Sequence, residues 1–184
     1  PIADVVCGNP HFPDEQKRLI SGTVGDTRVI CAYMPNGQEV GCDKYDYKLR
    51  WLDGLAVWVG EEMAKYPKLA LCGDYNIAPD DRDVHDPKRW ADCILVSPPE
   101  RAAFQRFLGL GLSDSFRLFE QPEKTFSWWD YRMLGFQKNQ GLRIDHVLLS
   151  KPLAEKCTAA GVDRAPRKLE RPSDHAPVWA EIGG

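Results

Sequence analysis

Residues 69–76 read Leu69-Ala70-Leu71-Cys72-Gly73-Asp74-Tyr75-Asn76, an apolar run of strand length that ends at a glycine before an acid and an amide. In an extended chain, residues i and i+2 point to the same side, so Asp74 and Asn76 are expected to face one spot beyond the strand end. The sheets of α/β proteins bind ligands at such ends. A carboxylate and a carboxamide there suit a hard cation, an activated water or a phosphate oxygen, although both residue types also favour plain turns.

Two later stretches place further acids near strand ends. Residues 143–149 put Asp145 inside an apolar strand, where an unpaired buried carboxylate is costly, so Asp145 needs a partner. That partner is either an arginine such as Arg143 or His175, which Asp145 would orient as the acid of a catalytic triad orients its histidine. His175 follows Asp174 in a loop that enters the last strand.

A metal site would explain the acids if their strand ends meet. Asp74, Asp145 and Asp174 would repel one another strongly in a low-dielectric cleft, and a divalent cation would relieve that repulsion. A ligand set of oxygens with one imidazole favours Mg²⁺ or Mn²⁺ over Zn²⁺. Such a site activates water and stabilises charge on a transferring phosphoryl group. Tyr33, at another strand end, could donate a hydrogen bond to a phosphate oxygen or simply be an aromatic side chain at the rim.

The composition sets limits on the class of protein. The chain has 184 residues and 43% hydrophobic content, which is enough for one domain with a sizeable core. Its net charge of −3 means that any contact with nucleic acid has to come from local patches. The six cysteines form no C-x-x-C pair, which favours a reduced cytoplasmic protein over a disulfide or zinc framework. Without a signal peptide or a long apolar span, no membrane partner is expected.

The order of elements predicts an α/β fold. The patterns predict strands over residues 18–24, 27–34, 69–74, 126–131, 143–149 and 178–182, and helices over residues 44–66 and about 97–108. Gly25-Asp26 joins the first two strands in a hairpin, so part of the sheet is expected to be antiparallel. Residues 1–13 show no clear element.

The aromatic block at residues 126–131 is a separate signal. Adjacent residues of a strand point to opposite faces, so one of Trp128 and Trp129 can be core and the other exposed. An exposed tryptophan beside Arg132 and Arg143 would suit stacking or wedging into nucleic acid, whereas two core tryptophans would carry no function.

Four motifs follow one another over nearly the whole chain: Gly73-Asp74-Tyr75-Asn76-Ile77-Ala78-Pro79, Trp128-Trp129-Asp130-Tyr131-Arg132, Gly141-Leu142-Arg143-Ile144-Asp145 and Ser173-Asp174-His175-Ala176-Pro177-Val178. Together they closely resemble the bacterial exonuclease III family, which belongs with the AP endonucleases to the endonuclease/exonuclease/phosphatase superfamily. The resemblance implies a four-layered α/β sandwich of two mixed β-sheets packed together with outer helices. It also implies a monomeric, Mg²⁺-dependent (or Mn²⁺-dependent) enzyme that cleaves double-stranded DNA at abasic sites and 3′ ends.

The resemblance also implies a role for each matching residue. Asp74 would activate the attacking water, and Asn76 would position Asp74. His175 would hold the scissile phosphate and pair with Asp145. Tyr33 would contact the phosphate. The expected metal ligands are Asp174, Asp74 and Asn76. With the aromatic and basic patch included, the expected DNA contacts and the apolar pocket for an extruded abasic sugar are Asn36, Trp128, Trp129, Arg132, Leu142, Arg143 and Ile144.

One departure from the family pattern stands out. The family opens with a strand that carries an asparagine, followed by a Gln-Glu pair whose glutamate is a main metal ligand, and nothing in this sequence matches either motif. Residues 1–184 are therefore expected to form a single domain that lacks the N-terminal part of the family fold, binds metal weakly by itself and has low or no activity alone. Two alternatives stay open, namely a phosphatase of the same superfamily acting on a lipid or inositol phosphate, and an inactive DNA-binding remnant.

Overall fold

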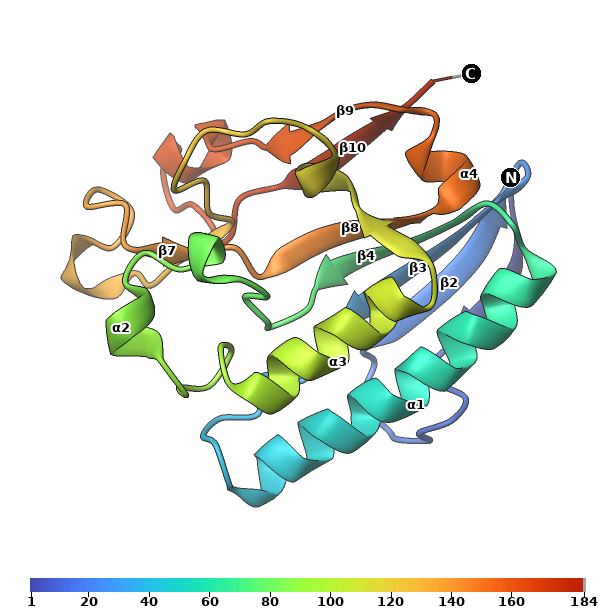
Figure 1. Cartoon of the computed structure of the whole chain (residues 1–184), viewed down its shortest axis with the longest axis horizontal. Helices are drawn as coiled ribbons and strands as arrows, with labels where there is room; N and C mark the ends of the chain where they lie inside the picture. Colours follow the sequence, from blue (N-terminus) through green and yellow to red (C-terminus); the bar gives the residue numbers. More distant parts are fainter. Residues whose placement is uncertain (184) are drawn as a thin grey trace.

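The central sheet has six strands in the order β1-β2-β3-β4-β8-β5. The computed structural model describes residues 1–183, and these strands span Ile2–Cys7, Leu19–Val24, Thr27–Tyr33, Leu69–Asp74, Asp145–Ser150 and Leu112–Asp114, respectively (Figure 1). Strands β3 and β4 run parallel, whereas the other neighbouring pairs run antiparallel. The predicted mixed α/β fold is therefore confirmed, including the hairpin between β2 and β3.

Two long helices, α1 (Asp43–Lys65) and α3 (Pro98–Gly109), lie side by side on one face of this sheet (Figure 1). Both are amphipathic, and their apolar stripes pack with the inward residues of β3 and β4 into the main core. Each large apolar side chain buried there stabilises the fold by about 1.5–3 kcal/mol. Ser97 and Glu100 form a capping box at the start of α3, which satisfies backbone N–H groups of its first turn.

The opposite face of the sheet carries smaller elements. An antiparallel pair, β9 (Cys157–Val162) and β10 (Val178–Ile182), packs over β8, and β6 (Trp128–Trp129) pairs with β7 (Gly141–Leu142) nearby. Short helical turns complete the described residues: η1 (Asp81–Asp83), α2 (Pro87–Trp90), η2 (Ser115–Leu118), η3 (Arg132–Leu134), α4 (Lys151–Ala154) and η4 (Ala165–Lys168). Within residues 1–183 these strands thus form two separate two-stranded antiparallel sheets, whereas one second, mixed sheet was expected.

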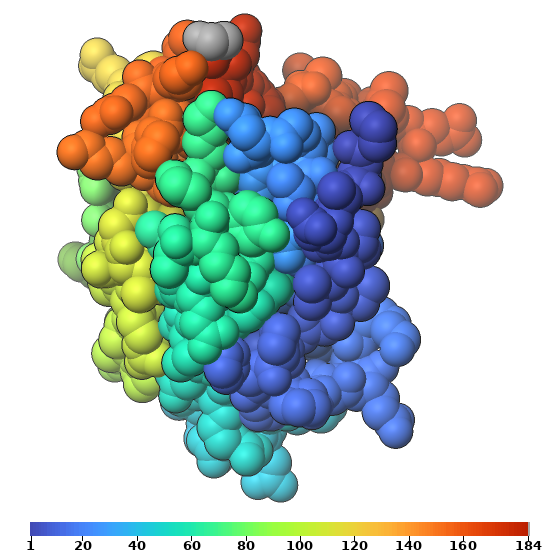
Figure 2. All heavy atoms as spheres, turned by 90° about the vertical axis from the view of Figure 1, so that its right-hand side faces the viewer, coloured from blue at the N-terminus to red at the C-terminus, as the bar shows by residue number. Residues whose placement is uncertain are grey.

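Strand β1 was not predicted, and its exposure explains why. Ile2 is 67% exposed and Val5 is 55% exposed, so this edge strand has no buried face to impose an apolar alternation. The register with β2 also shifts between Ala3 and Val6. Figure 2 shows these N-terminal residues, in dark blue, on the surface of the molecule.

None of the helices within residues 1–183 combines the length and the apolar character that crossing a membrane would require.

Gly73 allows β3 and β4 to approach closely beside the strand end. Its φ of +134° lies in a region that side chains rarely adopt, and a Cβ there would overlap the backbone carbonyl of Ala32. We expect Gly73→Ala to lower the free energy of unfolding by at least about 3 kcal/mol, because backbone strain and overpacking add up. Urea denaturation measures this change. Gly109→Ala is the matched control, since a Cβ there meets open space, and equal stability losses in both variants would contradict the account.

Candidate active site

The ends of three neighbouring strands meet at one edge of the sheet. Asp74 is the last residue of β4, where it pairs with Tyr33 of β3 on one side and with Asp145 of β8 on the other. Residues that pair directly on adjacent strands point to the same face. Their side chains therefore lie on the face of the sheet opposite α1 and α3.

His175 joins Asp74 and Asp145 at this edge. A ligand atom from each of the three residues lies within 4.8 Å of the other two. Nδ1 of His175 is 2.9 Å from Oδ2 of Asp145 and 3.1 Å from Oδ1, which is the expected histidine–acid pair. Asp145 is therefore partnered by His175, and the alternative partner Arg143 lies elsewhere.

The buried charges of this cluster perturb one another. Burial, and then the charge of Asp145, raise the pKa of Asp74 to about 7. Burial by itself would lower the pKa of His175, but the hydrogen bond to Asp145 and the charges of Asp145, Asp74 and Asp174 outweigh it, so this pKa is raised. Burial and a neighbouring carboxylate both raise a carboxyl pKa, and at Asp74 burial is the larger of the two causes.

Asn76 holds the carboxylate of Asp74 in place. Its backbone N–H donates to Oδ1 of Asp74 at 2.8 Å, and its Nδ2 donates to Oδ2 at 3.0 Å. Nδ2 also donates to the carbonyl of Met34, while Oδ1 accepts from Nδ2 of Asn36 at 3.0 Å. The left-handed φ of +51° at Asn76 is one that asparagine tolerates well. The side chain of Asn76 is thus arranged to orient Asp74.

Lys48 holds the backbone at Asn36 and Asn76, a role that the sequence analysis did not predict. This lysine of α1 is fully buried, and its Nζ donates to the carbonyls of Asn36 at 3.1 Å and Asn76 at 2.7 Å while pairing with Glu100. Burial lowers its pKa, although the charges of Glu100 and Asp74 oppose that effect. The sequence feature that could have indicated this role is the position of Lys48 on the apolar face of an amphipathic helix.

Asp174 lies beside this cluster but outside the group of three. Its Oδ2 accepts from Nε1 of Trp128 at 3.0 Å, and its backbone carbonyl accepts from the N–H of Trp129. Trp128 also forms an isolated bridge with His175. The tryptophan segment therefore fixes the loop that carries both Asp174 and His175.

The expected DNA contacts divide into exposed and buried sets. Tyr33, with the guanidinium of Arg18 5.1 Å above its ring, and Asn36 are exposed at the rim, and the side chain of Arg132 is 86% exposed. Trp128 is half-buried and Trp129 fully buried, as alternation in a strand allows. Two expected pocket residues are buried in a second core cluster against which Trp128 packs, namely Leu142 and Ile144.

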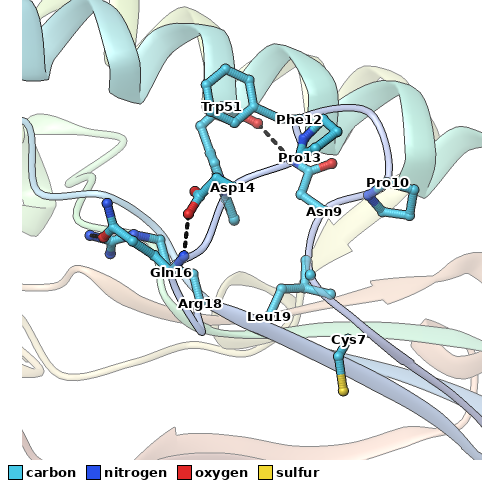
Figure 3. A pocket seen from close by; sticks show the side chains of 11 residues that line it. Cys7, Asn9, Pro10, Phe12, Pro13, Asp14, Gln16, Arg18, Leu19 and Trp51 are labelled. Atoms are coloured by element: carbon cyan, nitrogen blue, oxygen red, sulfur yellow. Dashed lines mark hydrogen bonds between the residues drawn. The ribbon is translucent and has the colours of Figure 1, made fainter.

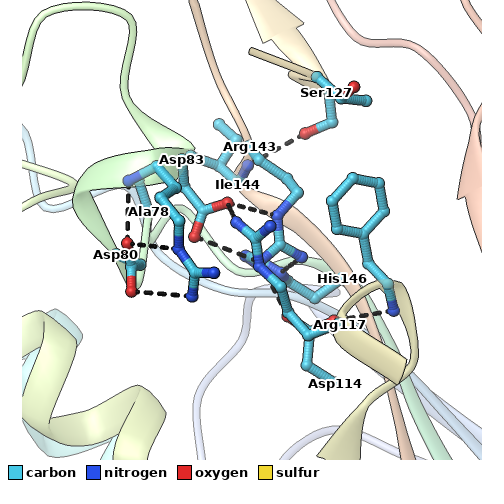
Figure 4. Close-up of polar contacts among 12 residues, drawn as sticks. Ala78, Asp80, Asp83, Asp114, Arg117, Ser127, Arg143, Ile144 and His146 are labelled. Carbon is cyan, nitrogen blue, oxygen red and sulfur yellow. Dashed lines mark hydrogen bonds and ion pairs between the residues drawn. The ribbon is translucent and has the colours of Figure 1, made fainter. Parts of the chain in front are cut away.

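The expectation that Arg143 contacts DNA is wrong, because this side chain is buried. Its side chain is 1% exposed and forms ion pairs with Asp83 at 2.6 Å and Asp114 at 2.8 Å (Figure 4). Its guanidinium also stacks on Phe116. The partners are distant in the sequence, so no local pattern reveals that this arginine belongs to a buried network.

The neighbouring His146 completes the network on the helix side. Its Nδ1 is 3.0 Å from Nη1 of Arg143, and its Nε2 is 2.9 Å from the carbonyl of Ile77. Burial, and then the charge of Arg143, lower the pKa of His146 to about 3. A neutral imidazole with Nε2 as donor and Nδ1 as acceptor satisfies both contacts, so His146 has a structural role here.

Removing the buried guanidinium is expected to destabilise the fold. Arg143→Met leaves Asp114 buried without its cation and Asp83 with only Arg117, so we expect the free energy of unfolding to fall by about 3–5 kcal/mol. Urea denaturation gives this value, with Arg132→Met as the exposed control that should change little. A stability unchanged by Arg143→Met, with DNA affinity lost, would restore the interpretation as a DNA contact.

A separate cavity of about 300 Å³ lies between residues 7–19 and Trp51 of α1 (Figure 3). Nδ2 of Asn9 donates to the carbonyl of Trp51 at its wall, and Phe12 meets Tyr47 edge to face nearby. It adjoins the site only through Arg18, which lines it and lies over the ring of Tyr33.

With this geometry established, comparison with known proteins gives the class. Residues 4–175 match the Endonuclease/Exonuclease/phosphatase family, and the chain belongs to that family. Its members are metal-dependent hydrolases. The family match confirms the resemblance to the endonuclease/exonuclease/phosphatase superfamily.

Individual relatives narrow the class to nucleases. The chain is 40% identical over 182 residues to exodeoxyribonuclease III of Haemophilus influenzae, covering 92% of this chain and 68% of that protein. Among solved structures, a Neisseria 3′ phosphatase (NExo) bound to a product DNA hairpin has a TM-score of 0.98 and 44% identity, over 100% of this chain and 72% of that one. An AP endonuclease from Archaeoglobus fulgidus has a TM-score of 0.93 and 33% identity, over 99% and 71%, respectively.

Proposed function

We propose that this protein is a DNA-repair nuclease that hydrolyses phosphodiesters at abasic sites and at 3′ ends of double-stranded DNA. The observation that carries the proposal is the convergence of Asp74, Asp145 and His175 at one edge of the sheet, with Asn76 orienting the first of them. The names of the relatives, an exodeoxyribonuclease, an AP endonuclease and a DNA 3′ phosphatase, support DNA as the substrate. We propose that it acts as a monomer in the cytoplasm.

The residues divide the work of phosphodiester hydrolysis. Asp74 is the proposed base, because its carboxylate is held by two hydrogen bonds from Asn76 and opens toward His175. Nδ1 of His175 donates to Asp145, so Nε2 is the nitrogen that would donate to an oxygen of the scissile phosphate. Tyr33, exposed at the rim, is proposed to contact the same phosphate.

The cluster also fits a divalent cation. The carboxylates of Asp74 and Asp145 suit a hard cation. The pKa of Asp74 is raised first by burial and then by the charge of Asp145, and a cation would relieve this second, like-charge contribution. Mg²⁺ or Mn²⁺ is the proposed ion, with Asp74 as a ligand and Asp174 and Asn76 kept as proposed ligands beside it. When bound, it would stabilise negative charge on the phosphoryl group.

The proposed DNA surface lies around this cluster. Arg132 is exposed, and Trp128 is half-buried against Leu142 and Ile144, where an extruded abasic sugar would fit. Trp129 would support this surface from the core. Asn36 would contact DNA from the Tyr33 side.

A substrate comparison tests the proposal. The protein is incubated with a duplex that contains one synthetic abasic site and, separately, with phosphorylated inositol, each in the presence of Mg²⁺. Incision of the DNA without release of phosphate from inositol is the expected result. The reverse pattern would favour the phosphatase, and DNA binding that ignores Mg²⁺ and never leads to cleavage would favour the inactive remnant.

A further inference from the structure

Ser127 lies directly behind the histidine–acid pair. It is completely buried, just before β6, and its Oγ is 2.6 Å from Oδ2 of Asp145. This is the same carboxylate oxygen that lies 2.9 Å from Nδ1 of His175. The three side chains therefore form one continuous chain of hydrogen bonds.

The hydrogen-bond geometry fixes which way the hydroxyl points. A serine hydroxyl has one proton and two lone pairs. The backbone N–H groups of Ile144 and Asp145 both donate to Oγ, each at 3.0 Å, and together they occupy both lone pairs; Figure 4 shows the contact with Ile144. The proton of Ser127 is thus left for Asp145, so the hydroxyl is a donor to that carboxylate.

The backbone of Ser127 holds the same segments. Its N–H donates to the carbonyl of Leu142 at 3.0 Å, and its carbonyl accepts from the N–H of Ala176 at 2.7 Å. One residue is therefore bound both to the segment that leads into β8 and to the loop that carries His175. A shift of the Ser127 side chain would misalign the acid relative to its histidine.

We propose that Ser127 is a positioning residue, which acts through Asp145 to hold the ring of His175 in its productive orientation. The effect on turnover rests on the proposed function, whereas the effect on the histidine ring does not. Hydrogen bonds of this kind to a functional side chain typically change activity by about 10- to 100-fold when they are removed.

The first measurement needs no substrate. The Nδ1–H of His175 is hydrogen-bonded to Asp145 and is expected to give a slowly exchanging ¹H–¹⁵N signal, assigned by its loss in His175→Gln. We expect Ser127→Thr, which keeps the hydroxyl, to retain this signal and Ser127→Ala to lose it. A signal that persists unchanged in Ser127→Ala, or that wild type lacks, would overturn the proposal.

Turnover of abasic-site DNA is the second measurement. Ser127→Ala is expected to lower kcat about 10- to 100-fold with KM nearly unchanged, and Ser127→Thr to restore most of kcat. In combination with Asp145→Ala, the serine substitution should cost little more, because it acts through that residue. Additive losses would overturn the proposal.

Ser150 provides a matched control for a merely structural role. It is also a buried serine, at the far end of β8, and its Oγ donates to the carbonyl of Pro67 at 2.7 Å and accepts from the N–H of Leu69 at 2.9 Å. Ser150→Ala should lower the midpoint of unfolding while leaving kcat and the His175 signal unchanged. If Ser150→Ala lowered kcat as much as Ser127→Ala does, the effect would be structural. A wild-type protein that shows the signal but does not cleave DNA would refute the proposed function alone.

Discussion

His175→Ala is expected to lower the turnover of abasic-site DNA by about a thousandfold or more, because it removes the imidazole proposed to hold the scissile phosphate. Asp145→Asn is expected to have a similar effect, since the imidazole would lose the carboxylate that fixes its tautomer and orientation. The double variant should be hardly worse than either single variant, because groups that act as one unit give losses that are far from additive. Single-turnover rates at saturating DNA measure these effects.

His11→Ala is the control for this series. His11 also pairs with an acid, Glu61 at 2.9 Å, but both side chains are exposed and lie outside the site. Its substitution should leave turnover unchanged. Losses that multiply in the His175/Asp145 double variant would show that the two residues act independently and would contradict the hydrogen-bonded pair.

Asp74→Asn is expected to lower the rate of DNA cleavage by about a thousandfold or more. The same substitution is expected to stabilise the protein at pH 8 when a chelator removes divalent ions. The pKa of Asp74 is raised to about 7 in the folded protein, from an ordinary value of 3.8, first by burial and then by the charge of Asp145. Folding therefore favours the protonated carboxyl, and the ionised form destabilises the fold. This penalty is fully present above pH 7 and disappears progressively as the pH falls toward 3.8.

Urea denaturation of both proteins at pH 8 and pH 5 isolates the contribution of Asp74. The asparagine variant should be more stable than wild type by about 1–3 kcal/mol at pH 8, and the difference should shrink at pH 5. Adding Mg²⁺ should narrow the gap at pH 8, because a bound cation relieves the repulsion in wild type. A difference that is independent of pH would mean that the carboxyl titrates normally.

The sequence predicts those parts of the site whose residues are close together in the chain, and it predicts contacts between distant residues less well. Asp74 and Asn76 were expected to face one spot because they stand two residues apart after a strand, and the structure has them hydrogen-bonded to each other. The pairing of Asp145 with His175 was one of two alternatives, and only the fold distinguishes them. The alternation of Trp128 and Trp129 likewise allowed one buried and one half-exposed ring.

Contacts between distant segments account for what the sequence did not show. Arg143 resembles a surface arginine until Asp83, 60 positions away, is placed against it. Ser127 has no local pattern at all, since its partners Ile144 and Asp145 come from the far side of a polar loop. Strand β1 lacks a buried face, so apolar alternation could not reveal it.

The central claim is that the Asp74 cluster performs metal-dependent cleavage of DNA. The most direct test incubates a duplex bearing one synthetic abasic site with the protein, with and without Mg²⁺, beside an Asp74→Ala variant whose folding is checked by circular dichroism. The account predicts incision that requires Mg²⁺ and is lost in the variant. Incision of equal rate in the variant, or no incision by wild type in the presence of Mg²⁺ or Mn²⁺, would contradict it.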